Sequence, residues 1–205
     1  MKTNGIDISK WQGNIDFNAV KKDGVKFVII RAGSGTKTDP YFERNYIMAK
    51  LAGLHVGVYW YSYAKSLYDA KMEAQAIENL LKDKQLDYPV YYDVEEKSQF
   101  AKGKKFVNGI IFEFCDYLEK RGYYVGVYMS KSYAQNYLTA DTVSRFDLWI
   151  AQYNSKCTYT GKYNMWQKSS TGKVNGINGN VDMNECYIDY ASIMRKVGLN
   201  GYVKK

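Results

Sequence analysis

The chain has 205 residues, of which 46% are hydrophobic, 24% are charged and only two are proline. A chain of this length and composition can bury a sizeable core, which excludes the disordered, collagen-like and membrane-spanning classes. Lysine and arginine outnumber aspartate and glutamate by 29 to 21, giving a net charge of +8. This charge favours a polyanionic partner such as nucleic acid, an anionic membrane or an acidic polymer.

Histidine and cysteine are scarce. The single histidine, His55, stands at the start of a predicted strand, where a structural role is expected, and one histidine excludes a multi-histidine zinc site. The three cysteines, Cys115, Cys157 and Cys186, are odd in number and form no CxxC pair, so neither a disulfide framework nor a metal site is indicated. A bond between Cys157 and Cys186 stays open. No cofactor is expected.

Short β-rich runs alternate with helix-like segments along the whole chain, a pattern typical of parallel α/β architecture. The expected strands are Gly5 to Ser9, Lys26 to Ala32, Val56 to Ser62, Val90 to Glu95, Tyr124 to Ser130, Leu148 to Tyr153, Tyr163 to Gln167 and Val181 to Asn184. Eight strands predict a barrel. No linker-like segment divides the chain, so residues 1–205 are expected to form one domain, of which residues 200–205 could be the remnant of a C-terminal linker.

Local signals delimit the helices between these strands. Asp39 is predicted as an N-cap with Pro40 at the first helical position, and Gly53 is expected to end that helix. Ser66 resembles the start of a capping box. Apolar residues at period four predict the clearest helix over residues 106–121.

A repeated segment accompanies these elements. Residues 53–59 and 122–128 share a glycine helix stop followed, two residues on, by Val-Gly-Val-Tyr. This internal repeat favours repeated βα units, with chance similarity between two buried strands as the alternative. The glycine-rich residues 169–180 are predicted to form a loop.

One run, Tyr88 to Glu96, carries two closely spaced acids. In a strand, residues two apart point to the same side, so Tyr91, Asp93 and Glu95 share one face. The carboxyl ends of parallel barrel strands form the active-site face, so this placement favours catalysis. Taken alone, the same pattern is also common on exposed edge strands.

Two further acids, Asp7 and Asp182, stand in the first and last predicted strands. If the barrel closes, these strands are neighbours, and both acids reach the same mouth as Asp93 and Glu95. Crowded carboxylates cannot all ionise cheaply, so the pKa of at least one should rise and leave a proton donor near neutral pH. Glycoside hydrolysis needs such an acid in a negative environment. A divalent metal site is the competing interpretation, but no phosphate-binding loop accompanies the acids, and no metal is expected.

Aromatic residues at strand ends agree with a sugar substrate. Tyr59, Tyr61, Tyr128 and Trp149 lie at or near the ends of predicted strands. Flat rings there could stack on sugar faces, and hydroxyls could bond to sugar oxygens. Each of these residues could equally belong to the core.

Several motifs, taken in order, resemble glycoside hydrolase family 25, the Chalaropsis-type N-acetylmuramidases found as bacterial autolysins and phage endolysins. The motifs are Gly5 to Gly13 (GIDISKWQG), Tyr92 to Glu95 (YDVE), Leu148 to Tyr153 (LWIAQY), Trp166-Gln167 and Gly179 to Asn184 (GNVDMN). The resemblance covers residues 5 to about 198. It implies an irregular, TIM-like (β/α) barrel and cleavage of the β-1,4 bond from N-acetylmuramic acid to N-acetylglucosamine in peptidoglycan.

The resemblance also implies roles for individual residues. Glu95 matches the general acid, whereas Asp93, Asp7 and Asp182 match supporting acids, and Gln167 joins the aromatic residues as a substrate-binding candidate. Two carboxyls on adjacent same-face positions leave no room for a water between them, which favours retention of configuration. Because the substrate carries a 2-acetamido group that can attack its own anomeric carbon, we hypothesise that Asp93 orients this group.

The expected partner is bacterial cell-wall peptidoglycan, whose carboxylates and accompanying phosphates suit the positive charge. The chain is expected to be a monomer that neither inserts into membranes nor binds nucleic acid. Its N-terminus lacks the apolar stretch of a secretion signal, so we expect a mature form or release by cell lysis, with activity at the wall outside the cell.

Three alternatives remain at this point. A chitinase-like hydrolase would share the paired acids and the acetamide chemistry but act on a different polymer. A catalytically inactive scaffold could bind wall glycan without cleaving it. Basic surface with aromatic residues also suits single-stranded nucleic acid, although the lysines are scattered and acids mark the strand ends.

Overall fold

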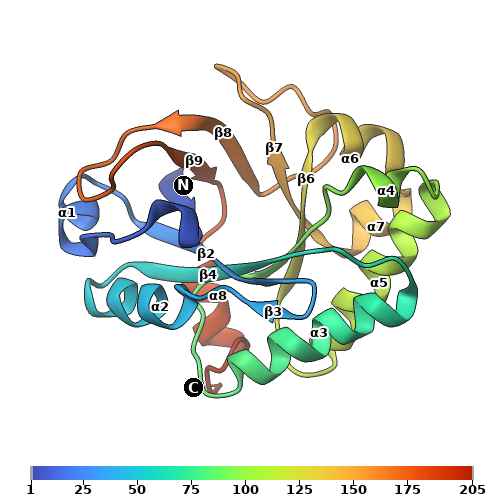
Figure 1. Ribbon diagram of the computed structural model, residues 1–205, viewed down its shortest axis with the longest axis horizontal. Coiled ribbons are helices and arrows are strands. Elements are labelled where there is room, and N and C mark those ends of the chain that lie inside the picture. The colour runs from blue at the N-terminus through green and yellow to red at the C-terminus, as the bar shows by residue number, and fades with distance from the viewer. Residues whose placement is uncertain (1, 205) are drawn as a thin grey trace.

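The computed structural model describes residues 2–204, which form a mixed α/β domain around a closed barrel of eight strands (Figure 1). The strands are β1 (Thr3–Ile8), β2 (Phe27–Ser34), β4 (His55–Tyr61), β5 (Val90–Asp93), β6 (Val125–Ser130), β7 (Asp147–Ala151), β8 (Met165–Gly172) and β9 (Val181–Cys186). Their order is β1-β9-β8-β7-β6-β5-β4-β2, and β1 also pairs with β2, which closes the ring. All eight predicted strands are confirmed. A short extra strand, β3 (Lys37–Thr38), pairs with β2 and was not predicted.

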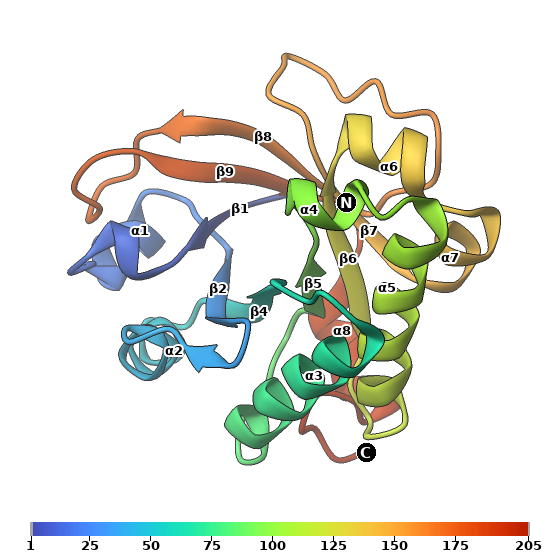
Figure 2. The ribbon, with the colours of Figure 1, turned by 45° about the vertical axis from the view of Figure 1, so that its right-hand side comes forward.

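The helices are α1 (Phe17–Lys22), α2 (Phe42–Leu51), α3 (Leu67–Leu81), α4 (Lys97–Phe100), α5 (Lys104–Glu119), α6 (Lys131–Tyr137), α7 (Ala140–Arg145) and α8 (Tyr190–Val197), with a 3-10 turn η1 (Lys10–Gln12). The long helices α3 and α5 lie side by side on the outside of the barrel (Figures 1 and 2). Residues 152–164, between β7 and β8, contain no helix, so the barrel is irregular, as expected. Within residues 2–204, no helix combines the length and apolar character needed to cross a bilayer.

The expectation of parallel strands is wrong for the last one, because β9 runs antiparallel to both β8 and β1. A parallel pair needs a crossover of a dozen or more residues, and the connection from Gly172 to Val181 is too short for one. Strand β8 therefore continues into the predicted loop at 169–180 and turns back as a hairpin, which lies over α1 (Figure 2). The turn is held there by a hydrogen bond from the Asp16 N–H to the Gly176 carbonyl (2.9 Å).

The repeated Val-Gly-Val-Tyr segments have a common packing role. Gly57 on β4 and Gly126 on β6 both lie where a side chain would collide with the neighbouring strand, and a Cβ on Gly126 would lie 2.6 Å from the ring of Tyr91. The repeated segment thus corresponds to two positions that face the barrel interior, where glycine leaves room for the side chains packed there. Two residues further on, Tyr59 and Tyr128 share the inward face and line the cavity at the barrel mouth.

The predicted helix ends are confirmed at Ser66 and Gly53, whereas α5 begins and ends two residues earlier than predicted and the start of α2 differs. Ser66 caps α3 by accepting a hydrogen bond from the Asp69 N–H (3.1 Å), and Gly53 follows α2 with a φ of 72°. The N-cap of α2, however, is Tyr41 and not Asp39. Asp39 instead accepts hydrogen bonds from the Tyr41 N–H (2.9 Å) and the Arg31 Nε (2.7 Å), so it joins α2 to β2.

Helix α5 confirms the predicted period-four face, although Phe106 at its start is only half-buried. Phe114 from this face stacks on Tyr92 of β5, with ring centroids 3.9 Å apart. All three cysteines lie in the described part of the chain and are free thiols, so the bond between Cys157 and Cys186 is not formed.

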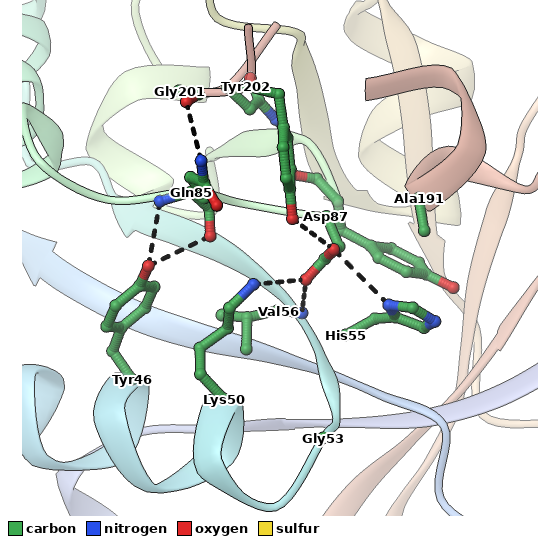
Figure 3. Close-up of polar contacts among 12 residues, drawn as sticks. Tyr46, Lys50, Gly53, His55, Val56, Gln85, Asp87, Ala191, Gly201 and Tyr202 are labelled. Atoms are coloured by element: carbon green, nitrogen blue, oxygen red, sulfur yellow. Dashed lines mark hydrogen bonds and ion pairs between the residues drawn. The ribbon is translucent and has the colours of Figure 1, made fainter. Parts of the chain in front are cut away.

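At the end of the barrel opposite the mouth, polar groups converge on Asp87, which precedes β5 (Figure 3). Lys50 approaches its carboxylate to 2.9 Å, Tyr202 donates to it at 2.7 Å, and His55 lies 3.6 Å away. Arg195 from α8 forms a further ion pair with the same carboxylate. His55 therefore has a structural place beside Asp87, at the opposite end of the barrel from Asp93 and Glu95, as expected. This cluster ties α2, α8 and the C-terminal segment to the barrel.

Candidate active site

A cavity of about 260 Å³ opens at the barrel mouth, where the parallel strands end. All four predicted acids line it: Asp7 from β1, Asp93 from β5, Glu95 just beyond β5, and Asp182 from β9. Asp182 is the second residue of its strand, and it reaches the mouth because β9 runs antiparallel to β1, with Asp7 and Asp182 as direct cross-strand partners.

Asp7 is buried and held by two amide side chains. Its Oδ2 accepts hydrogen bonds from Asn184 Nδ2 (2.7 Å) and Gln167 Nε2 (3.0 Å). These amides are oriented in turn, because Trp149 Nε1 donates to Asn184 Oδ1 (2.8 Å) and the Tyr128 hydroxyl donates to Gln167 Oε1 (2.8 Å). Burial, followed by the charge of Asp182, raises the pKa of Asp7 well above its ordinary value.

Asp93 is buried at the cavity floor. Its Oδ1 has no hydrogen-bond partner among the described residues. Burial raises its pKa well above the usual range, and the charges of Glu95 and Asp7 raise it further, whereas the nearby Arg31 guanidinium opposes this shift. A buried acceptor without a partner is costly, so this oxygen is suited to a ligand that donates a hydrogen bond.

Glu95 and Asp182 are only half-buried, so they lie nearer the opening than Asp7 and Asp93. Burial raises the pKa of Glu95, and the charge of Asp182 adds to the effect. Burial also raises the pKa of Asp182, although its hydrogen bond with Asp7 opposes the shift. A carboxyl near the opening with a raised pKa can keep its proton at a pH where an exposed glutamate has lost it.

The five predicted substrate-binding residues all line the cavity, but in two different ways. Tyr59 and Tyr61 are half-buried, and Tyr61 presents its ring on the wall while its hydroxyl donates to Glu96 (2.8 Å). Tyr128, Trp149 and Gln167 are buried, and their polar atoms are engaged in the hydrogen bonds that hold Asp7.

Several residues that line the cavity were not singled out from the sequence. Arg31 stands at the end of a predicted strand, where a lone base among acids could have been noticed. Trp11, Gln12 and Tyr153 fall inside the quoted motifs, yet nothing in their local pattern distinguishes them from neighbours. Tyr153 adds a second phenol to Gln167 Oε1 (3.0 Å).

The four acids do not form a metal centre by geometry. No group of three or more histidine, cysteine, aspartate or glutamate side chains in residues 2–204 is arranged to hold a metal ion. The set instead offers a buried carboxyl oxygen without a partner and, near the opening, a carboxyl whose pKa is raised. This combination suits acid-assisted cleavage of a glycosidic bond.

Comparison with known proteins gives consistent results. The family model described as "Glycosyl hydrolases family 25" matches residues 6–177. An autolytic lysozyme of Clostridium acetobutylicum is 38% identical over 183 residues, which are 88% of this chain and 55% of that protein. The chain thus spans about half the length of this relative.

Solved structures agree with this match. The modular autolysin LytC of Streptococcus pneumoniae, in complex with a synthetic peptidoglycan ligand, superposes with a TM-score of 0.83 at 30% identity over 91% of this chain and 47% of that one. A family 25 glycosyl hydrolase from Bacillus anthracis superposes with a TM-score of 0.81 over 98% of this chain and 93% of that one; at 23% identity this likeness concerns the fold alone. By the extent of the family match and the identity to these relatives, the chain belongs to glycosyl hydrolases family 25.

Proposed function

We propose that this domain is a muramidase that hydrolyses the β-1,4 bond between N-acetylmuramic acid and N-acetylglucosamine in peptidoglycan, with net retention of configuration. The observation that carries the proposal is the pairing of the buried, unpartnered Asp93 Oδ1 with Glu95 beside it at the barrel mouth. The lysozyme and autolysin names of the relatives support the choice of substrate. Residues 1–205 act as one catalytic unit, as a monomer at the cell wall.

Glu95 is the general acid in this proposal. Its raised pKa lets it hold a proton, which it gives to the glycosidic oxygen as the bond to the anomeric carbon breaks. After the leaving sugar departs, the Glu95 carboxylate takes a proton from a water that attacks the same carbon. Asp7 and Asp182 supply negative potential for the oxocarbenium-like transition state.

Asp93 acts on the acetamido group of the substrate. The acetamide oxygen attacks the anomeric carbon and forms a cyclic oxazolinium ion, while the acetamide N–H donates to Asp93. Water then opens the ring on the face the leaving group occupied, so two inversions give net retention. The free lone pairs of Asp93 Oδ1 support this role, because a carboxyl oxygen without a partner can accept the bond from the acetamide N–H.

The function is tested by mass spectrometry of the soluble fragments released from purified peptidoglycan. The expected result is fragments that end in reducing N-acetylmuramic acid. Fragments ending in reducing N-acetylglucosamine would contradict the muramidase assignment and indicate a glucosaminidase. Equal turnover of chitin oligomers would favour the chitinase-like alternative, and the absence of fragments would favour a wall-glycan binding module.

The role of Asp93 has a separate test. A 5-fluoro sugar substrate that keeps its 2-acetamido group and slows the second step, followed by intact-protein mass spectrometry, is expected to give no covalent adduct. The physical reason is that the substrate's own acetamide, and not the Asp93 carboxylate, occupies the anomeric carbon. A glycosyl ester mapped to Asp93 would show that this residue is a nucleophile and would overturn the assisted mechanism.

A further inference from the structure

An aromatic side chain outside the cavity, Tyr63, continues the wall that Tyr61 begins. The two rings lie 5.0 Å apart between centroids, with 50° between their planes. Tyr61 lines the cavity, whereas Tyr63 lies beyond it with 53% of its surface exposed. A lone exposed tyrosine carries no meaning by itself, so the surroundings of Tyr63 decide what it can do.

The backbone of Tyr63 is fixed by a buried carboxylate. Its N–H donates to Glu73 Oε1 (2.8 Å), and the other oxygen, Oε2, accepts from the Tyr92 hydroxyl (2.6 Å). Glu73 lies on α3 and is only 2% exposed. Burial raises its pKa to about 7, although the bonds from Tyr92 and Tyr63 oppose the shift. Burying a carboxylate costs free energy, and within the described residues Glu73 takes no part in the catalytic cavity.

The residues on either side of Tyr63 are equally constrained. The Ser62 N–H donates to the Asp93 carbonyl (2.9 Å), and the Ser62 hydroxyl donates to Tyr92 (2.8 Å). The Ala64 carbonyl accepts from Gln99 Nε2 (3.1 Å). Hydrogen bonds therefore hold the backbone of residues 62–64 in place, and Ser62 joins this segment to the strand that carries Asp93.

The ring of Tyr63 is supported from one side. Gly35, in the turn between β2 and β3, lies against it, because a Cβ built there would be 3.5 Å from Tyr63 Cδ2. The Gly35 N–H donates to the Tyr61 carbonyl (3.0 Å), which holds this turn against the same wall. The turn at Gly35 thus lies near one side of the Tyr63 ring, while about half of the residue's surface is exposed to solvent.

We propose that Tyr63 is an outer sugar-binding platform that extends the cleft past Tyr61, and that Glu73 is the positioning residue that holds it. The inference rests on the proposed function, because it assigns the ligand as a saccharide unit of the same glycan, remote from the bond that is cleaved. An aromatic ring offers a flat apolar face to the C–H face of a pyranose. A ring held on a fixed backbone loses little conformational entropy when the sugar binds, which favours affinity.

The test compares soluble, uncrosslinked peptidoglycan glycans of defined length, from the shortest that is cleaved to chains several disaccharides longer. The variants are Tyr63→Ala, Tyr63→Trp and, as a matched control, Tyr68→Ala, whose ring is 69% exposed on the first turn of α3. Tyr63→Ala is expected to raise KM about 5- to 10-fold for the longest glycan, with a ratio near one for the shortest and kcat retained. Tyr63→Trp should keep the wild-type dependence on length, and Tyr68→Ala should match wild type throughout.

Glu73→Leu tests the positioning role, because leucine cannot accept the hydrogen bond from the Tyr63 N–H, whereas Glu73→Gln still can and serves as the conservative control. Glu73→Leu should raise KM for the long glycan but not for the short one, Glu73→Gln should resemble wild type, and the double variant of Glu73→Leu with Tyr63→Ala should be no worse than Tyr63→Ala alone. Additive effects of the two changes, or an equal rise in KM at every length, would contradict the proposal. So would an unchanged length dependence in Tyr63→Ala.

A binding measurement separates this inference from the proposed function. Isothermal titration of the same glycans, carried out in the Glu95→Gln background so that they are not cleaved, should show weaker binding of the long glycan, and only the long glycan, when Tyr63→Ala is added. If wild type binds glycans without cleaving them, the proposed function is wrong, but weaker binding of the long glycan to Tyr63→Ala would still support the sugar-binding role of Tyr63. If wild type cleaves them and Tyr63→Ala binds long and short glycans as wild type does, the platform fails while the function stands.

Discussion

Replacing Glu95 with glutamine is expected to lower kcat on peptidoglycan about 1,000-fold. Glutamine keeps the size of the side chain but has no proton to give to the glycosidic oxygen, so the leaving sugar departs as an unstabilised alkoxide. The measurement is the rate at which reducing ends appear, with the thermal unfolding midpoint recorded in parallel. The midpoint should not fall, because glutamine removes a charge that burial and Asp182 disfavour.

The neighbouring carboxylate provides the control. Glu96 is the next residue, but it does not line the cavity, and a glutamine there can still accept the Tyr61 hydrogen bond. Glu96→Gln should therefore retain activity within about tenfold of wild type. If the two variants lose activity equally, Glu95 is not the acid.

The pH dependence of wild type follows from the same residue. Because the pKa of Glu95 is raised, its proton is present at low pH and is lost as pH rises through that raised value. The rate should therefore fall on the alkaline side of the profile, and Glu95→Gln should lack this limb.

Replacing Asp87 with asparagine is expected to lower the free energy of unfolding by about 3 kcal/mol at pH 7. The side chain of Asp87 is 2% exposed and faces Lys50, Arg195 and the His55 ring, so neutralising it leaves the two basic side chains without their common partner. These partners are themselves partly exposed, which keeps the effect at the lower end for a buried ion pair. Urea unfolding measures the difference.

The pH dependence of this effect identifies its cause. Burial alone would raise the pKa of Asp87, but the contacts from His55, Lys50 and Tyr202 outweigh it and hold the pKa well below the usual 3.8. A lowered pKa means that the carboxylate stabilises the fold above pH 3.8 and that this contribution is lost as pH falls further. The gap between wild type and Asp87→Asn should thus be constant from pH 7 to 5 and shrink towards pH 3.

An exposed ion pair serves as the matched control. Glu43 pairs with Lys84 at 2.9 Å, but its side chain is 54% exposed. Glu43→Gln should change the free energy of unfolding by less than about 1 kcal/mol. A comparable loss in both variants would mean that charge count, and not burial, determines the result.

Periodicity predicted most of this fold because each signal is local. The apolar runs of the eight strands and the period-four face of α5 depend on neighbours a few residues away. The direction of β9 does not depend on near neighbours in the sequence. It depends on how short the connection from β8 is and on which strand closes the ring. Asp39 failed as a helix cap for a related reason, because Arg31 lies closer to it in space than the sequence indicates.

The acids of the candidate site were predictable because they stand at strand ends, which topology brings together. Arg31 could have been found by the same rule. Glu73 could not, because a glutamate on a helix normally faces solvent, and its burial shows only when α3 packs on the barrel and the Tyr92 hydroxyl donates to it. The engagement of Trp149 and Tyr128 in holding Asp7 is likewise a property of the closed ring and of no single strand.

Closure of the ring by β9 also sets when the site can exist during synthesis. Asp7 is made well before its partners Gln167, Asn184 and Asp182, which are 160, 177 and 175 positions later along the chain. A nascent chain that has not yet exposed β9 has an open barrel, with Asp7 unpaired and one acid missing. Because these contacts join segments so far apart along the chain, a competent active site cannot form until β9 has left the ribosome.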